Sequence, residues 1–251
     1  IINSFDSRIA GGGDGNITDY PFLTALLTNQ DGAWRQKCGG SILTTSAILS
    51  AASCFYTSRN QRSFWILLAI TDNLTVGSNN ANSGGTVYII NRITPHENFD
   101  STTLVNDIAV LRTNLAINFQ PNLVAAARIA GAAYTYGDRQ EVWAVGWGHG
   151  STATPSERLQ VAQVWLINQQ TCTNRHTEAG FTVTNTMVCA GYLDVGERGQ
   201  CEGDVGGPLL DSSGAVIGVF SRAHDCANLY YPDINTRVSS FTWWIINAAR
   251  A

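Results

Sequence analysis

The sequence lacks several features that would place the chain in other protein classes. No window of its 251 residues approaches the roughly 18 consecutive apolar residues of a membrane-spanning helix. No positively charged start precedes an apolar run, so we expect any signal peptide to have been removed already. The net charge of -4 offers no basic surface for nucleic acid. No two cysteines form a CxxC pair, which argues against a zinc site. These absences indicate a soluble globular protein without a metal or another cofactor.

Lysine is almost missing as well. Lys37 is the single lysine among 15 basic residues, and the others are all arginine. Arginine keeps its charge far above the pH at which lysine starts to lose its proton. The surface would therefore suit a strongly alkaline fluid. A codon or lineage bias explains the same composition equally well.

Helical periodicity is nearly absent, and short β-branched or aromatic runs alternate with turn residues instead. The runs include Phe22–Leu27, Ser41–Ser50, Thr86–Ile93, Ile108–Leu111, Val142–Trp147, Leu159–Val164 and Ala215–Phe220. Many short strands at regular spacing predict a β-sandwich or a β-barrel. One helix is expected at the end of the chain, where Ser239 or Ser240 can cap a segment with Trp244 and Ile245 on its apolar side. The segment Asn114–Ala127 is the expected crossing between two halves.

The cysteines form an even and widely spaced set, which favours disulfides in an oxidising compartment. They are Cys38, Cys54, Cys172, Cys189, Cys201 and Cys226. Glycosylation sequons at Asn16 and Asn73 are compatible with secretion, although such short patterns also arise by chance.

A series of short motifs then identifies a resemblance that covers nearly the whole chain. The motifs are RIAGG (Arg8–Gly12), CGGSIL (Cys38–Leu43), LSAASCF (Leu49–Phe55), NDIAVLR (Asn106–Arg112), VGWG (Val145–Gly148), CAGY (Cys189–Tyr192), CEGDVGGPL (Cys201–Leu209) and PDINTRV (Pro232–Val238). Each resembles a characteristic motif of the chymotrypsin/trypsin family of serine proteases. The residues within the motifs are most similar to those of insect proteins, particularly those of moths and butterflies.

The resemblance implies an all-β fold of two antiparallel six-stranded β-barrels with a C-terminal helix. The implied limits are about 9–120 for the first barrel, about 121–238 for the second and about 239–250 for the helix, within a protease domain of residues 9–251. The implied disulfides are Cys38–Cys54, Cys172–Cys189 and Cys201–Cys226.

The family's chemistry needs a serine nucleophile, a histidine base and an aspartate that orients the histidine. By resemblance Asp107 is the aspartate, whereas Ser53 stands at the histidine position and Val205 at the serine position. Valine has no lone pair for attack on a carbonyl. Loss of one triad member costs about 10⁴- to 10⁶-fold in turnover. The sequence therefore predicts a pseudoprotease without ordinary peptidase activity.

No histidine obviously replaces the missing base. His96 is expected on the surface, and His149 and His176 fall in predicted loops. His224 is the one histidine expected near the rim of the substrate pocket. The oxyanion hole, by resemblance the backbone N–H groups of Gly203 and Val205, either survives as an anion- or carbonyl-binding nest or is merely a foldable turn.

The specificity pocket implied by the resemblance comprises Gly199, Ser221, Arg222, Ala223 and Asp233. Gly199 stands at the pocket base, and Asp233 on the wall can accept a basic side chain. Ala223 adds a methyl group at the entrance, and Arg222 replaces an aromatic platform. Either Arg222 narrows the cleft with Asp233 as its charge partner, or Arg222 faces solvent and Asp233 is hydrated.

Activation in the family cuts the chain before an Ile-Val-Gly-Gly-type start, and the new amine pairs with the acid before the nucleophile. Here the bond is Arg8–Ile9 and the acid is Asp204. Residues 1–8 are included and contain no cysteine that could tether them. We therefore expect residues 1–8 to be an uncleaved remnant of the activation peptide and Asp204 to lack its amine partner, as in a zymogen.

The function expected from these residues is that of a secreted, non-catalytic homologue that acts by binding a protein partner. The partner would be a protease, a protease inhibitor or a component of a protease or innate-immune cascade, in haemolymph or the gut lumen. Alternatives are a decoy that absorbs inhibitors, a protein that recognises a microbial surface or a small ligand, a storage protein and, least favoured, a residual serine endopeptidase.

Overall fold

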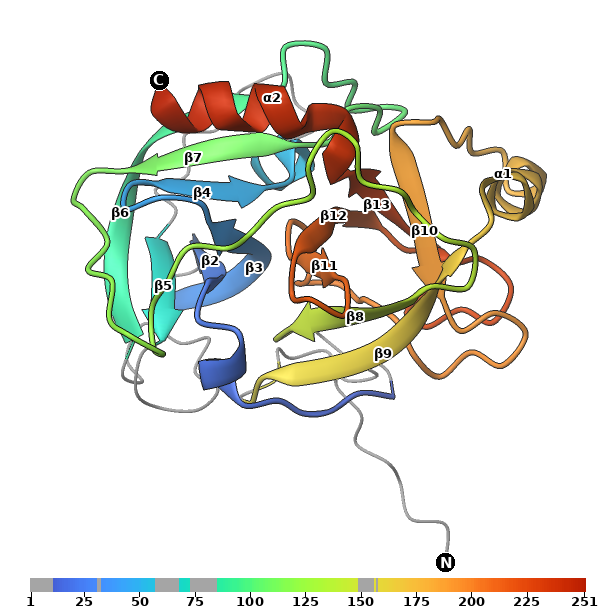
Figure 1. The fold of residues 1–251 in the computed structure, drawn as a ribbon, viewed down its shortest axis with the longest axis horizontal. Coiled ribbons are helices and arrows are strands. Elements are labelled where there is room, and N and C mark those ends of the chain that lie inside the picture. Colours follow the sequence, from blue (N-terminus) through green and yellow to red (C-terminus); the bar gives the residue numbers. More distant parts are fainter. Residues whose placement is uncertain (1–10, 31–32, 57–67, 73–84, 149–155, 157) are drawn as a thin grey trace, which may run out of the picture.

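Two antiparallel β-structures follow each other along the chain and lie side by side, with one helix across them and one at the far end (Figure 1). This computed structural model describes residues 11–30, 33–56, 68–72, 85–148, 156 and 158–251. The first half contains β1 (Gly13–Asp14), β2 (Leu23–Gln30), β3 (Ala33–Ile42), β4 (Ala47–Ser50), β5 (Leu68–Asp72), β6 (Gly85–Pro95), β7 (Ala109–Thr113) and the 3₁₀ turns η1 (Ile17–Asp19) and η2 (Ala52–Phe55). The second contains β8 (Glu141–Gly146), β9 (Gln160–Ile167), β10 (Met187–Gly191), β11 (Pro208–Leu210), β12 (Val216–Arg222), β13 (Asp233–Arg237) and the helices α1 (Gln169–Glu178) and α2 (Val238–Arg250).

The first half is a closed barrel with the strand order β2-β3-β4-β7-β6-β5. Its interior is filled by aliphatic side chains with no solvent exposure, among them Leu26, Ile48 and Leu111. Gly40 lets β3 approach β4, because a Cβ atom there would lie 2.9 Å from Ile48 Cγ2. Closure leaves the barrel no free strand edge.

Strand β1 from the start of the chain joins the strands of the second half in a seven-stranded sheet with the order β1-β9-β10-β13-β12-β11-β8. Strand β8 also pairs with β9, so the sheet curls back on itself. Strand β9 alternates buried and partly exposed residues, with Ala162, Val164 and Leu166 facing the core. The predicted chymotrypsin-like fold is confirmed, and β1 adds a strand to the second half that the sequence did not predict.

The expected C-terminal helix is present as α2, which packs against β4 and β7 of the barrel and β12 of the sheet (Figure 1). Its buried side includes Phe241 and Ile245, and Arg112 Nη1 donates to Ala249 O at 2.6 Å. The predicted serine cap is wrong, because the residue before the helix is Arg237 and no side chain caps the first turn.

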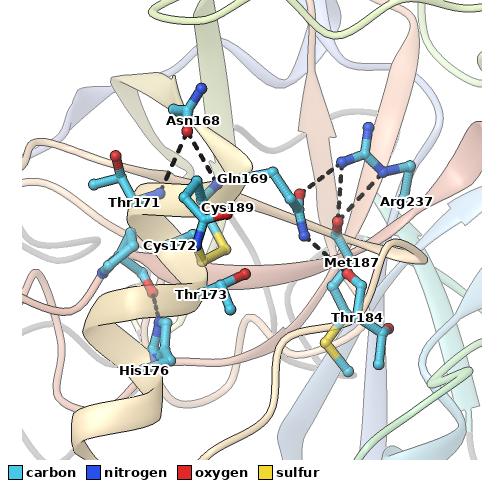
Figure 2. Close-up of a disulfide and its surroundings, with 12 residues drawn as sticks. Asn168, Gln169, Thr171, Cys172, Thr173, His176, Thr184, Met187, Cys189 and Arg237 are labelled. Carbon is cyan, nitrogen blue, oxygen red and sulfur yellow. Dashed lines mark hydrogen bonds between the residues drawn. A yellow bond between two sulfur atoms is a disulfide. The ribbon is translucent and has the colours of Figure 1, made fainter.

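Helix α1 was not predicted, because its sequence is polar and buries only Cys172 and His176. Asn168 caps it, its Oδ1 accepting from the N–H groups of Gln170 and Thr171 (Figure 2). A disulfide between Cys172 and Cys189 fastens the helix to β10 (Figure 2). Arg237 also links α1 to β10, because its Nη2 donates to Gln169 Oε1 at 2.9 Å and to Met187 O at 3.1 Å.

All three disulfides implied by the resemblance are confirmed: Cys38–Cys54, Cys172–Cys189 and Cys201–Cys226. The predicted division near residue 120 falls between β7 and β8, and the exact limits remain a prediction. Residues 1–8 and Asn73 lie outside the described residues. Within the described ranges, no helix has the length and apolar character needed to cross a membrane.

Candidate active site

The candidate centre contains Ser53 and Asp107, which lie next to two paired strands of the first barrel. Ser53 lies in η2, directly after β4, and Asp107 lies just before β7. The Asp107 carboxylate is fully buried. Its Oδ1 accepts from the Ser53 N–H at 2.7 Å, and its Oδ2 accepts from Ser53 Oγ at 2.8 Å. The serine hydroxyl therefore occupies the side of Asp107 at which the resemblance places a histidine.

The second half completes the surroundings of Asp107. From β12, Ser221 Oγ donates to Asp107 Oδ2 at 2.6 Å, and from β13, Thr236 Oγ1 donates to the Asp107 carbonyl at 2.7 Å. Burial raises the pKa of Asp107, while the hydrogen bonds from Ser221 and Ser53 lower it. Because burial has the larger effect, the group holds a proton more readily than an exposed aspartate.

Val205 stands at the nucleophile position, in a turn whose backbone requires glycine at other positions. Gly203 and Gly206 adopt φ angles of 90° and 84°, and a Cβ atom on Gly206 would lie 2.6 Å from Gly39 O. The turn is joined to the first barrel through the Gly39 N–H, which donates to Val205 O at 2.8 Å. The side chain of Val205 is half-buried and packs against the core.

The backbone of this turn also presents the two N–H groups of the expected oxyanion hole. Among the described residues, neither the Gly203 N–H nor the Val205 N–H donates a hydrogen bond. Gln36 Nε2 donates to Gly203 O at 3.0 Å and so orients the turn from β3. Gln36 was not predicted as a site residue, because nothing in the local sequence links it to a residue 167 positions away.

Asp204, next to Val205, is buried beneath the turn. Its Oδ1 accepts from the Gly148 N–H at 2.7 Å and its Oδ2 from the Cys201 N–H at 3.1 Å. A Cβ atom on Gly146 would lie 3.1 Å from Asp204 Cγ, so this glycine of the VGWG motif makes room for the carboxylate. Burial raises the pKa of Asp204 to about 7, against the opposing effect of both N–H groups.

The expected cleavage at Arg8–Ile9 and the expected lack of an amine partner stay predictions. Both Arg8 and Ile9 lie outside the described residues. Within the described part of the chain, no basic side chain pairs with Asp204.

The expected pocket residues Gly199 and Asp233 lie together. A Cβ atom on Gly199 would be 2.7 Å from Asp233 Oδ2, so the glycine leaves the space that the carboxylate occupies. The same Oδ2 accepts from the Gln200 N–H at 2.7 Å. Burial, together with the nearby Asp204, raises the pKa of Asp233 well above its ordinary value. The amide of Gln200, also unremarked in the sequence, is buried and has no hydrogen-bond partner among the described residues.

The guanidinium of Arg222 packs on an aromatic ring instead of pairing with Asp233. Its guanidinium carbon is 4.5 Å from the centroid of the Phe181 ring, and among the described residues no ion pair joins it to Asp233. Ala223 follows it and is partly exposed.

None of the three described histidines bonds to Asp107 or Ser53. His176 was expected in a loop, but it is buried in α1 with its Nε2 2.8 Å from Pro232 O. His96 packs against Phe241 and Trp244 of α2, and His224 is exposed beside Tyr231. His149 lies outside the described residues. Across the described ranges, no three His, Cys, Asp or Glu residues group as metal ligands.

Comparison with known proteins agrees with the fold and gives the site its context. The sequence model of the trypsin family matches residues 9–245. "Trypsin, alkaline B" of Manduca sexta is 46% identical over 242 residues, which cover 96% of this chain and 90% of that protein. "Trypsin, alkaline A" of the same moth is 44% identical, covering 98% and 93%, and "Trypsin CFT-1" of Choristoneura fumiferana is 44% identical, covering 95% and 90%.

These relatives contradict the expectation of a pseudoprotease that acts by binding. They are named as trypsins and are 44–46% identical over nearly the full chain. Such names point to serine endopeptidases and support neither a cascade modulator nor a decoy, a recognition protein or a storage protein. The expected loss of function rested on Ser53 and Val205, whereas the relationship to trypsins extends over nearly the whole chain. The disulfides and the insect relatives fit an extracellular protein. The chain belongs to the trypsin family of serine proteases.

Proposed function

We propose that this chain is a digestive serine endopeptidase of the trypsin type that acts on polypeptides in the gut lumen. The observation that carries the proposal is its identity of 44–46% with lepidopteran trypsins over nearly its whole length. The scarcity of lysine agrees with an alkaline medium, in which arginine stays charged. Three of the relatives carry the word alkaline in their names.

The substrate class follows from Asp233. A buried carboxylate beside Gly199 offers a counter-charge to a basic side chain that enters the pocket. Because burial raises the pKa of Asp233, an alkaline medium favours the ionised form that binds a cation. We therefore assign polypeptides with an arginine or a lysine at the cleavage position as the substrates.

The groups that remain for the reaction differ from those of the family. Valine cannot form an acyl-enzyme, so attack has to come from water. Ser53 Oγ can pass its proton to Asp107 Oδ2, 2.8 Å away, while it receives one from the attacking water. The N–H groups of Gly203 and Val205 can take up the developing charge on the carbonyl oxygen. As the C–N bond of the tetrahedral intermediate breaks, Asp107 returns this proton through Ser53 Oγ to the leaving amine nitrogen, so the proton count balances. The route lacks both a strong nucleophile and an imidazole.

The test compares the chain with a variant that carries both family residues, Ser53→His together with Val205→Ser. Turnover of a fluorogenic arginine amide should be measurable above the buffer rate but about 10⁴- to 10⁶-fold slower than that of the double variant. Asp107→Asn in the unaltered background should reduce it further. A rate equal to the buffer blank, with an active double variant prepared in parallel, would contradict the proposed function.

A further inference from the structure

Arg222 lies beside the candidate centre and is held there by the sheet. It is the last residue of β12, directly after Ser221, whose Oγ bonds to Asp107. The pairing of β12 with β13 shifts register between Phe220 and Arg222, so that Arg222 faces Ile234. Arg222 is therefore the chain neighbour of Ser221, whose hydroxyl donates to Asp107.

The guanidinium of Arg222 is half-buried against an aromatic face. Its central carbon lies 4.5 Å from the centroid of Phe181, a distance typical of a cation–π contact. Burial lowers its pKa, and no carboxylate raises it. The group still stays protonated, because arginine does not lose its proton in proteins. Phe181 covers one face of the guanidinium and leaves the N–H groups at its edges available.

Other arginines that lie over aromatic rings show what Arg222 lacks. Arg175 lies over Tyr230 and donates to Asp194 at 2.9 Å. Arg237 lies over Tyr136 and donates to Gln169 and Met187. Among the described residues, the guanidinium of Arg222 has no hydrogen bond and no ion pair. Arg198, over Tyr192, shares this isolation but does not lie beside Ser221.

Two histidines, His176 and His224, lie near Arg222. Arg222 and His224 both lower the pKa of His176 through their charge, after the larger effect of burial. The nearest acid along the chain is Asp225, which is exposed and accepts from Asn228 Nδ2 at 3.3 Å. No nitrogen of Arg222 is among the described buried polar atoms that lack a partner, so its N–H donors reach the surface and are open to an acidic ligand.

We propose that Arg222 binds the carboxylate of an aspartate or glutamate side chain in a polypeptide that lies along Ser221–Ala223, and so selects acidic segments next to the reacting bond. The inference rests on the proposed function only in taking a polypeptide as the ligand. A planar guanidinium with one face on a ring matches a carboxylate through two parallel N–H bonds. A polyanion such as a sulfated polysaccharide fits less well, since the chain carries a net charge of -4 and presents one isolated arginine here.

The experiment measures binding and therefore does not depend on turnover. Acetylated pentapeptides of the sequence Ala-Ala-Ala-Ala-Arg are prepared with one alanine at a time replaced by Glu or by Gln, which has the same shape without the charge. Affinities are measured calorimetrically at low and at high salt. At one position Glu should bind about tenfold more tightly than Gln, and the preference should shrink as salt rises.

Variants of the chain assign the preference to Arg222. Arg222→Gln should remove it and Arg222→Lys should keep part of it, while thermal unfolding reports that both remain folded. Arg250→Gln, which removes the same charge at the exposed end of α2, should leave it unchanged. Equal binding of Glu and Gln peptides at every position, no binding at millimolar concentration, or a preference that survives in Arg222→Gln would each overturn the proposal.

A sulfated oligosaccharide serves as the competing ligand, and its binding through Arg222 in preference to the Glu peptide would also count against the proposal. The two proposals fail separately. A Glu preference without any hydrolysis would leave the Arg222 site standing and remove the proposed function. Hydrolysis without a Glu preference would do the reverse.

Discussion

Replacing Asp204 by asparagine should change how stability depends on pH. Burial raises the pKa of this carboxyl from 3.8 to about 7 in the folded chain. A folded state that holds its proton more tightly than the unfolded state loses stability as pH rises between these values. With 1.36 kcal/mol for each pH unit, the free energy of unfolding falls by about 4 kcal/mol between pH 4 and 7 on account of Asp204 alone. Asparagine keeps the shape without the ionisation.

Urea unfolding at a series of pH values from 4 to 8 tests this reasoning. Because the amide nitrogen of asparagine cannot accept from the Cys201 N–H, the variant should be about 1–2 kcal/mol less stable than the unaltered chain near pH 4. Its stability relative to the unaltered chain should rise progressively above pH 5 and reach its full gain above pH 7. Asp211→Asn is the control, because its pKa has the opposite shift. Burial raises the pKa of Asp211, but hydrogen bonds from Ser213 and Ala215 outweigh this and lower it overall. That variant should be destabilised mainly above pH 4. A difference in stability between Asp204→Asn and the unaltered chain that stays constant from pH 4 to 8 would refute the argument.

Three further changes test other parts of the structure. Thr236→Val removes the hydroxyl that donates to the Asp107 carbonyl at 2.7 Å, and should lower the free energy of unfolding by about 1–2 kcal/mol in urea titrations. His176→Gln should lessen the loss of stability on acidification below about pH 6.5, because burial lowers the pKa of His176 and the unfolded state binds the proton first; melting temperatures at pH 5 and 8 measure this. Replacing Cys172 and Cys189 by serine should cost about 3 kcal/mol by calorimetry, since the bridge closes a short loop.

Much of the fold was predictable from local motifs. The cysteines and the glycines around Val205 and Asp204 lie in short sequence motifs, and each motif requires a particular backbone conformation. The barrels and the three disulfides could therefore be predicted from the resemblance. Helix α1 did not follow, because only Cys172 and His176 turn inward and two buried residues give no detectable period.

The surroundings of the candidate site were less predictable, because they are made by contacts distant in sequence. Ser221 and Asp107 are 114 positions apart, and no local pattern signals their hydrogen bond. The placement of Arg222 over Phe181 depends in the same way on how the segment after α1 packs on β12. The functional prediction was wrong for a different reason. The prediction depended on two side chains, Ser53 and Val205, that bear on one reaction step. The relationship to trypsins rests on the whole chain.

The position of Asp107 also has a consequence for how the protein unfolds. Its side chain and its carbonyl are both satisfied by β12 and β13, although Asp107 itself belongs to the first barrel. Separating the two halves would leave a buried carboxyl group without Ser221 and a buried carbonyl without Thr236. Neither barrel can open alone without that loss. The halves should therefore melt in a single cooperative transition, with Asp107 among the residues that couple them.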